Sequence, residues 1–114
     1  MSRLCMLVMK PPHSDEDARR MCGLLSSARA KGMGVGVYLL GDGVYCAKKG
    51  HRGLVGESLR SALSKGAEIN ASKKDLLSRA MGEADVEPGV KVLEDLESTF
   101  VEDMMERSER VTSW

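Results

Sequence analysis

The sequence predicts an α/β fold: a single three-layer domain over residues 1–114, with a mostly parallel open sheet of about five strands and helices on both faces. Short, continuously apolar segments alternate along the chain with longer segments whose apolar residues recur at helical spacing. Such alternation is typical of βαβ units, in which helices connect parallel strands. With 114 residues, of which 42% are hydrophobic, the chain can form a core without disulfide or metal support.

The first half of the chain predicts one complete βαβ unit. Residues 4–9 are continuously apolar, as in a strand that is buried on both faces. A helix follows, with Ser14 as its N-cap, and it ends by Gly32. Residues 35–40 form a second apolar strand, so we expect a right-handed crossover between two parallel strands.

The second half continues the alternation. We expect Leu77 on the inner face of a helix that Ser72 caps, and we expect Phe100, Val101, Met104 and Met105 within the apolar stripe of the last helix. The predicted elements are, in order, helix 54–63, strand 67–71, helix 73–81, surface loop 83–89, strand 90–93, helix 96–105 and edge strand 110–114.

Composition excludes several classes of protein. Lys and Arg (17) balance Asp and Glu (17), which argues against a general nucleic-acid binder. The first apolar segment is too short for a signal peptide or a membrane span. Three widely spaced cysteines predict neither a disulfide framework nor a zinc site. We therefore expect a cytoplasmic protein with reduced thiols, no metal and no cofactor, and without nucleic-acid or membrane partners.

Charge is distributed unevenly along this neutral chain. Residues 48–52 are basic, whereas residues 83–109 carry most of the acids. The basic residues directly follow the second predicted strand, at whose carboxyl end ligands gather in open α/β sheets. The basic cluster therefore has two interpretations. It attracts an anionic ligand or an acidic partner, or it is simply a solvated loop.

Cys46 is the candidate reactive thiol. If a short helical turn begins near Val44, free backbone N–H groups and the neighbouring basic side chains favour the thiolate. Its alternative is a small half-buried thiol packed under the next helix. The candidate ligand-binding or loop-shaping residues are Asp42, Gly43, Tyr45, Lys48, Lys49, His51, Ser72 and His13. Structural roles are open for these too: turn formation for Asp42, a helix cap for Ser72 and a surface loop for His13.

Two segments of the chain carry recognisable motifs. The first is Tyr38-Leu39-Leu40-Gly41-Asp42-Gly43-Val44-Tyr45, an apolar strand followed by a variant of Asp-Gly-Val. The second is Asn70-Ala71-Ser72-Lys73-Lys74-Asp75-Leu76-Leu77-Ser78-Arg79-Ala80, a strand with an Asp-Leu-(Leu/Ile)-x-Arg continuation. Both segments resemble the DsrE/DsrF/DsrH-like superfamily of small sulfur-relay proteins, and the second, like Phe100-Val101 and Trp114, looks DsrH-like.

The resemblance implies a compact α/β fold that assembles into homo-oligomers or into hetero-oligomers with related small proteins. It also implies that some members carry sulfur as a cysteine persulfide between donor and acceptor proteins. In the DsrE type that cysteine sits just after the third strand, a position that falls here at about Ala71, next to Ser72, where there is no thiol.

Three hypotheses about function follow. In the first, the protein acts in sulfur relay or related thiol chemistry, with Cys46 as the persulfide-carrying thiol. In the second, it is a non-catalytic assembly or regulatory subunit that kept the fold and lost the chemistry. In the third, it binds a small ligand in the crevice at the strand ends. An accessible Cys46 with a depressed pKa would favour the first hypothesis.

Overall fold

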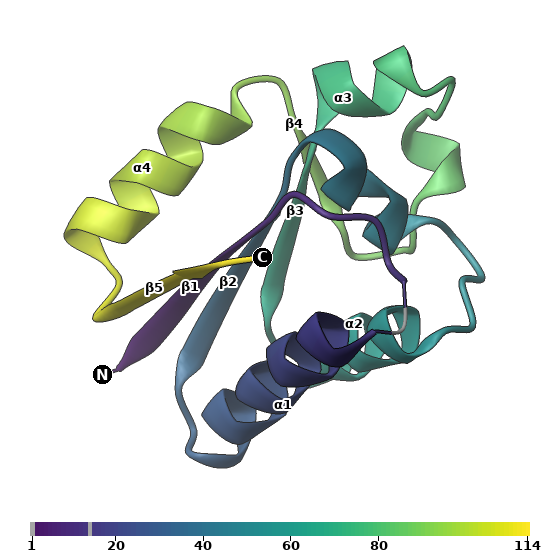
Figure 1. The fold of residues 1–114 in the computed structure, drawn as a ribbon. Coiled ribbons are helices and arrows are strands. Elements are labelled where there is room, and N and C mark those ends of the chain that lie inside the picture. The colour runs from purple at the N-terminus through teal and green to yellow at the C-terminus, as the bar shows by residue number, and fades with distance from the viewer. Residues whose placement is uncertain (1, 14) are drawn as a thin grey trace.

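Five parallel strands form one open sheet in the order β4-β3-β2-β1-β5 (Figure 1). In this computed structural model, which describes residues 2–13 and 15–114, every strand pairing is parallel. The predicted fold class is therefore confirmed. The strands are β1 (Arg3–Val8), β2 (Gly34–Leu39), β3 (Glu68–Ser72), β4 (Lys91–Leu93) and β5 (Arg110–Ser113).

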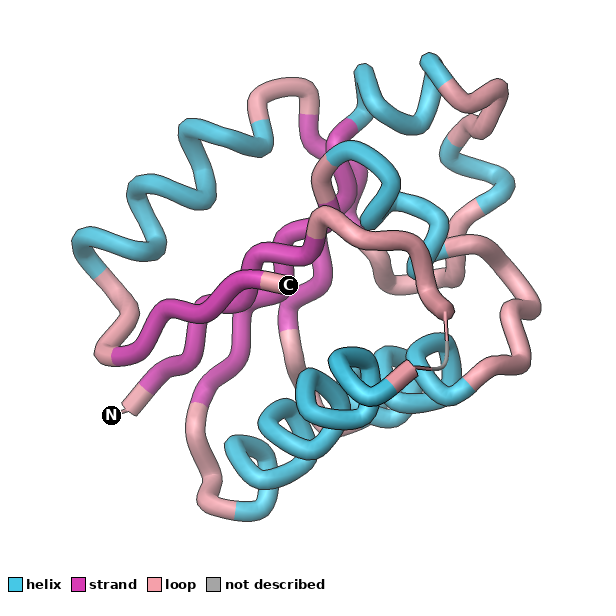
Figure 2. The backbone as a smooth tube through the Cα atoms, viewed as in Figure 1, coloured by secondary structure: helices cyan, strands magenta, loops and turns pink. Residues whose placement is uncertain are grey.

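Helices cover both faces of the sheet, and Figure 2 shows the same arrangement in the backbone tube. Helices α1 and α2 pack against each other on one face, and α4 lies on the opposite face (Figure 1). No helix among the described residues is long and apolar enough to span a bilayer. The helices are α1 (Glu16–Ala30), α2 (Leu54–Ser64), α3 (Lys73–Ser78) and α4 (Leu96–Glu106), with short 3-10 helices η1 (Gly41–Ala47) and η2 (Glu83–Asp85).

The ends of α1 are determined by local chemistry. The side chain of Asp15 accepts a hydrogen bond from the backbone N–H of Ala18 at 2.8 Å and so caps the first turn. The predicted cap, Ser14, lies outside the described residues. At the other end, Gly32 adopts φ +75°, a left-handed conformation that favours glycine and ends the helix.

The core is divided unequally between the two faces of the sheet, because successive strand residues point to opposite sides. Met6 belongs to the large cluster under α1 and α2, whereas its neighbour Cys5 belongs to a small cluster under α4. In that small cluster only Cys5, Tyr38 and Leu96 are fully buried. One helix therefore covers this face with few apolar contacts.

Two predictions about apolar faces are wrong. Val101 and Met105 are 43% and 75% exposed. The side of α4 that faces the sheet carries Phe100, Asp103 and Met104, and Val101 and Met105 therefore point away from it. Leu77 is 62% exposed, since α3 already ends at Ser78 and does not reach Met81.

The predicted surface loop 83–89 is exposed over most of its length and contains η2. Its exception is Val86, which is buried and forms an antiparallel bridge with Lys48. This bridge connects the loop before β4 to the segment that follows η1.

The chain reverses its direction across the sheet beside β1. From β1 it proceeds outward through β2 and β3 to β4, and then returns to β5 on the other side of β1. A topological switch point therefore lies between β1 and β5, which is where ligands bind in many open α/β sheets.

Candidate functional site

The loop that carries the predicted thiol packs tightly against the end of β1. A Cβ on Gly43 would lie 2.1 Å from the carbonyl oxygen of Val8, a separation that no side chain tolerates. The N–H of Leu40 donates to the same Val8 carbonyl oxygen at 2.9 Å. Glycine at position 43 is thus required for η1 to lie where it does, and the predicted loop-shaping role of Gly43 has this physical basis.

Cys46 lies inside the protein, not on its surface. The residue is 2% exposed, and Sγ lies 3.6 Å from the carbonyl oxygen of Lys10, to which the thiol can donate. Burial raises the pKa of Cys46 to about 12. The predicted helical turn exists, since η1 begins at Gly41. The predicted depressed pKa is wrong, because the cost of burying the thiolate exceeds the help from nearby N–H groups.

The other two cysteines are also buried, as predicted. Burial raises the pKa of Cys5 to about 11 and also raises the pKa of Cys22. All three thiols therefore disfavour the thiolate, which is the form that attacks sulfur.

Asp42 and Tyr45 meet at one side chain that the sequence interpretation did not single out, Arg79. Two guanidinium nitrogens of Arg79 donate to Oδ1 of Asp42 at 3.0 and 2.9 Å. The guanidinium carbon lies 5.9 Å from the centre of the Tyr45 ring. Asp75 accepts the N–H of Gly41 at 3.0 Å. These contacts attach η1 to α3. The sequence offered one indication that Arg79 matters, because it is the arginine of the Asp-Leu-(Leu/Ile)-x-Arg motif.

The basic cluster does not surround the thiol. Lys48, Lys49 and Arg52 are exposed, where water screens their charges. His51 is half-buried at the start of α2, and its Nε2 has no hydrogen-bond partner in the structure. The cluster thus presents a basic surface but gives Cys46 no charged partner.

His13 and Ser72 do not join Cys46 in one crevice. His13 lies in the loop after β1, as its structural alternative of a surface loop predicts, whereas Cys46 is buried. Ser72 is buried at the N-cap position of α3, but its side chain makes no capping hydrogen bond. Its predicted position is right and its predicted hydrogen bond is absent.

A buried ionic network under α4 was not anticipated. Arg3 donates from Nε and Nη2 to the Asp103 carboxylate at 2.8 and 2.7 Å. Tyr38 and Ser108 donate their hydroxyls to the same carboxylate at 2.5 and 2.8 Å. Burial alone would raise the pKa of Asp103, but the hydrogen bonds from Arg3, Tyr38 and Ser108 lower it to about 2. The network attaches α4 to the sheet.

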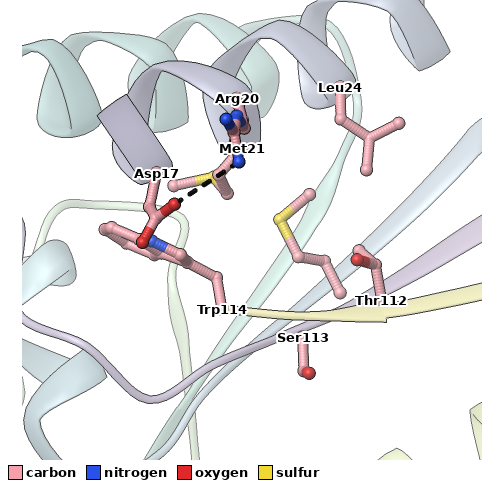
Figure 3. A pocket seen from close by; sticks show the side chains of 8 residues that line it. Asp17, Arg20, Met21, Leu24, Thr112, Ser113 and Trp114 are labelled. Carbon is pink, nitrogen blue, oxygen red and sulfur yellow. Dashed lines mark ion pairs between the residues drawn. The ribbon is translucent and has the colours of Figure 1, made fainter. Parts of the chain in front are cut away.

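The switch point between β1 and β5 holds a recess of about 190 Å³ (Figure 3). Asp17 and Arg20, 3.9 Å apart, form an ion pair on its α1 side. Trp114 forms part of its wall, and its backbone N–H donates a hydrogen bond to the Leu7 carbonyl oxygen of β1 at 2.8 Å. The remaining lining residues are Met6, Met21, Leu24, Thr112 and Ser113.

No metal centre is apparent among residues 2–13 and 15–114. Nowhere in these ranges do three or more His, Cys, Asp or Glu side chains gather closely enough to hold a metal ion.

Comparison with known proteins identifies a family and a fold. The model of the DsrE/DsrF-like family matches residues 2–94. The solved structure of the ychN protein from E. coli superposes with a TM-score of 0.81 at 12% identity, covering 100% of both chains. A protein of unknown function from Methanobacterium thermoautotrophicum, MTH1491, superposes with a TM-score of 0.76 at 17% identity, covering 98% of this chain and 99% of that one. No curated protein sequence matches the chain.

Proposed function

The chain belongs to the DsrE/DsrF-like family, and from that premise we propose that it acts as a non-catalytic assembly subunit, not as a sulfur carrier. The observation that carries this proposal is the burial of all three thiols. Sulfur transfer needs an accessible thiolate. The position after β3 that the family resemblance associates with sulfur is occupied here by Ala71 and Ser72, both buried.

The proposed partners are further copies of this chain or related small proteins. Supporting this, α4 exposes apolar side chains at Val101 and Met105, and exposed apolar patches often mark protein interfaces. Unbridged cysteines fit a reducing compartment, so we place this function in the cytoplasm.

The sulfur-relay alternative requires a definite chemical step at Cys46. Its thiolate would attack the outer sulfur of a donor persulfide, forming the Cys46 persulfide and releasing the donor as a thiolate. The burial of the thiol and its raised pKa oppose this step. Movement of η1 away from β1 would be needed before the sulfur atoms could meet.

The thiol reactivity of the folded protein tests this proposal. We expect alkylation of Cys46 by iodoacetamide, followed by mass spectrometry from pH 5 to 10, to be slow and to show no midpoint near the free-cysteine value of about 8.5. Denaturant should make all three thiols react fast, which controls for reagent quality. Cys46→Ser should leave the sedimentation coefficient unchanged.

Fast labelling of folded protein near neutral pH, together with persulfide formation at Cys46 in the presence of a low-molecular-weight persulfide, would overturn the proposal. It would establish the sulfur-carrier alternative instead.

A second candidate function is small-ligand binding, favoured by the recess at the switch point. Apolar Met6, Met21 and Leu24 line it, and the opposite charges of Asp17 and Arg20 offset each other. The chemistry suits a small, mostly apolar molecule without a strong net charge.

Trp114 provides a direct measurement of ligand binding, because it is the only tryptophan in the chain and part of the recess wall. If the recess is a ligand site, cyclohexanol at up to about 10 mM should change its emission and raise the melting temperature. Benzoate should have less effect.

Leu24→Phe, which fills part of the recess, should weaken the cyclohexanol response, and Cys46→Ser should not. Trp114 emission that stays unchanged with both probes would eliminate this candidate.

A further inference from the structure

The outer surface of α4 combines exposed apolar side chains with acids. Val101 and Met105 are four residues apart and therefore lie on one side of the helix. Glu97, Glu102 and Glu106 line the same shallow depression. We call these five residues the α4 stripe.

A second surface has the complementary character. Lys48, Lys49 and Arg52 are exposed, and none of them takes part in an ion pair among the described residues. Leu54, two residues later, is 38% exposed. We call these four residues the basic surface.

Among the described residues, no acid forms an ion pair with the basic surface. Glu83 and Glu87 line a hollow beside Lys49, but Glu87 already accepts the Gly50 N–H at 2.9 Å and pairs with Arg60 at 3.3 Å. In the α4 stripe, Glu102 and Glu106 likewise take part in no ion pair among the described residues.

The two surfaces cannot meet within one molecule. Figure 1 shows α4 at the left of the sheet, whereas the segment between η1 and α2, which carries the basic surface, bulges at the far right. A second copy of the chain can bring the two together.

Charge also opposes the symmetric alternative. Two α4 helices packed face to face would place Glu102 and Glu106 against the same residues of the other copy, and such like-charge contacts are destabilising. Opposite charges meet when the α4 stripe of one copy contacts the basic surface of another.

We propose that the α4 stripe of one copy docks on the basic surface of a second copy, head to tail. The proposal rests on the assembly function above and names its contact. Leu54 would pack against Val101 and Met105, surrounded by Lys–Glu and Arg–Glu pairs. Because the two surfaces differ, repeating the contact closes a ring or extends a filament.

Two charge-reversed variants test this contact by sedimentation velocity at low salt. Variant A carries Glu102→Lys and Glu106→Lys, and variant B carries Lys49→Glu and Arg52→Glu. Each alone brings like charges together, so its self-association should weaken at least about tenfold. An equimolar mixture of A and B again pairs opposite charges and should reassociate. Higher salt should weaken the wild-type contact, since the pairs lie near the surface.

Apolar substitutions supply a matched control. Met105→Ser should weaken association, whereas Leu77→Ser, which removes another exposed apolar side chain (62% against 75% for Met105) outside the α4 stripe, should not. All variants change exposed side chains, so equal melting temperatures will verify that they fold.

The outcomes separate this contact from the assembly function. Self-association of variant B as tight as that of the wild type would overturn the head-to-tail contact, while assembly itself would stand. A mixture of A and B that stays monomeric would also overturn the contact. A wild-type protein that is monomeric at every concentration would overturn both the contact and homo-oligomeric assembly.

Discussion

Replacing Asp103 with alanine is expected to lower the free energy of unfolding by about 3–5 kcal/mol. The substitution removes the main partner of the buried Arg3 guanidinium, which keeps only a 3.4 Å contact to Glu68, and it removes the acceptor of the Tyr38 and Ser108 hydroxyls. Breaking a buried ion pair by removing one partner is strongly destabilising, because the remaining buried charge loses most of its compensation. Urea unfolding of wild type and variant measures the difference.

Two variants calibrate this result. Glu102→Ala removes an exposed carboxylate from the neighbouring position of α4 and should change stability by less than about 0.5 kcal/mol. Tyr38→Phe removes one hydrogen bond of the network and should cost about 1 kcal/mol. A loss below about 1 kcal/mol for Asp103→Ala would contradict the buried ionic network.

The stabilisation by Asp103 should depend on pH in a defined direction. Its pKa falls to about 2 in the folded protein, compared with about 3.9 for an aspartate in an unfolded chain. A depressed carboxyl pKa stabilises the fold fully above the unfolded value, and this contribution is lost as the pH falls through the folded value. The stability difference between wild type and Asp103→Ala should therefore be constant above about pH 5 and shrink toward pH 2.

Replacing Gly43 with alanine is expected to lower the free energy of unfolding by about 3 kcal/mol. The new Cβ would lie 2.1 Å from the Val8 carbonyl oxygen and 2.7 Å from its carbonyl carbon, so backbone must move. Because η1 would shift away from β1, Cys46 should also become faster to alkylate. Urea unfolding and the thiol-labelling rate measure the two effects.

Gly23→Ala is the matched control for Gly43→Ala. Gly23 is exposed within α1, and an added Cβ would meet nothing within 4 Å. Alanine there should raise stability by about 0.5–1 kcal/mol, because it restricts the unfolded chain and favours the helix. A Gly43→Ala variant as stable as Gly23→Ala would refute the close contact between η1 and β1.

The candidate site shows where sequence interpretation succeeds and where it stops. The turn containing Cys46 could be anticipated, since glycines and an aspartate directly follow an apolar strand. The chemical state of Cys46 could not, because the basic residues beside it in sequence lie on the outside while the thiol faces inward. Side chains that are neighbours in the sequence can therefore differ completely in their exposure to water.

Asp103 illustrates the same limit in α4. Asp103 is an acid within the apolar stripe of the last helix. Its partner Arg3 lies a hundred residues away in β1. A sequence pattern favours exposing such charges, whereas the tertiary structure buries them as a pair. Burial of this pair takes space on the inner side of α4 and leaves Val101 and Met105 on the outside.

By itself the sequence determined the alternation of strands and helices, the parallel sheet and the family resemblance. These depend on periodicity, capping residues and turn formers, which act over a few neighbouring positions. Only the tertiary structure decided the burial and raised pKa of Cys46, the pairing of Arg79 with Asp42 and the network around Asp103. Each depends on residues that are far apart along the chain and become neighbours when the sheet forms. In the low dielectric of the interior, burial and hydrogen bonding then determine whether each titratable group is charged.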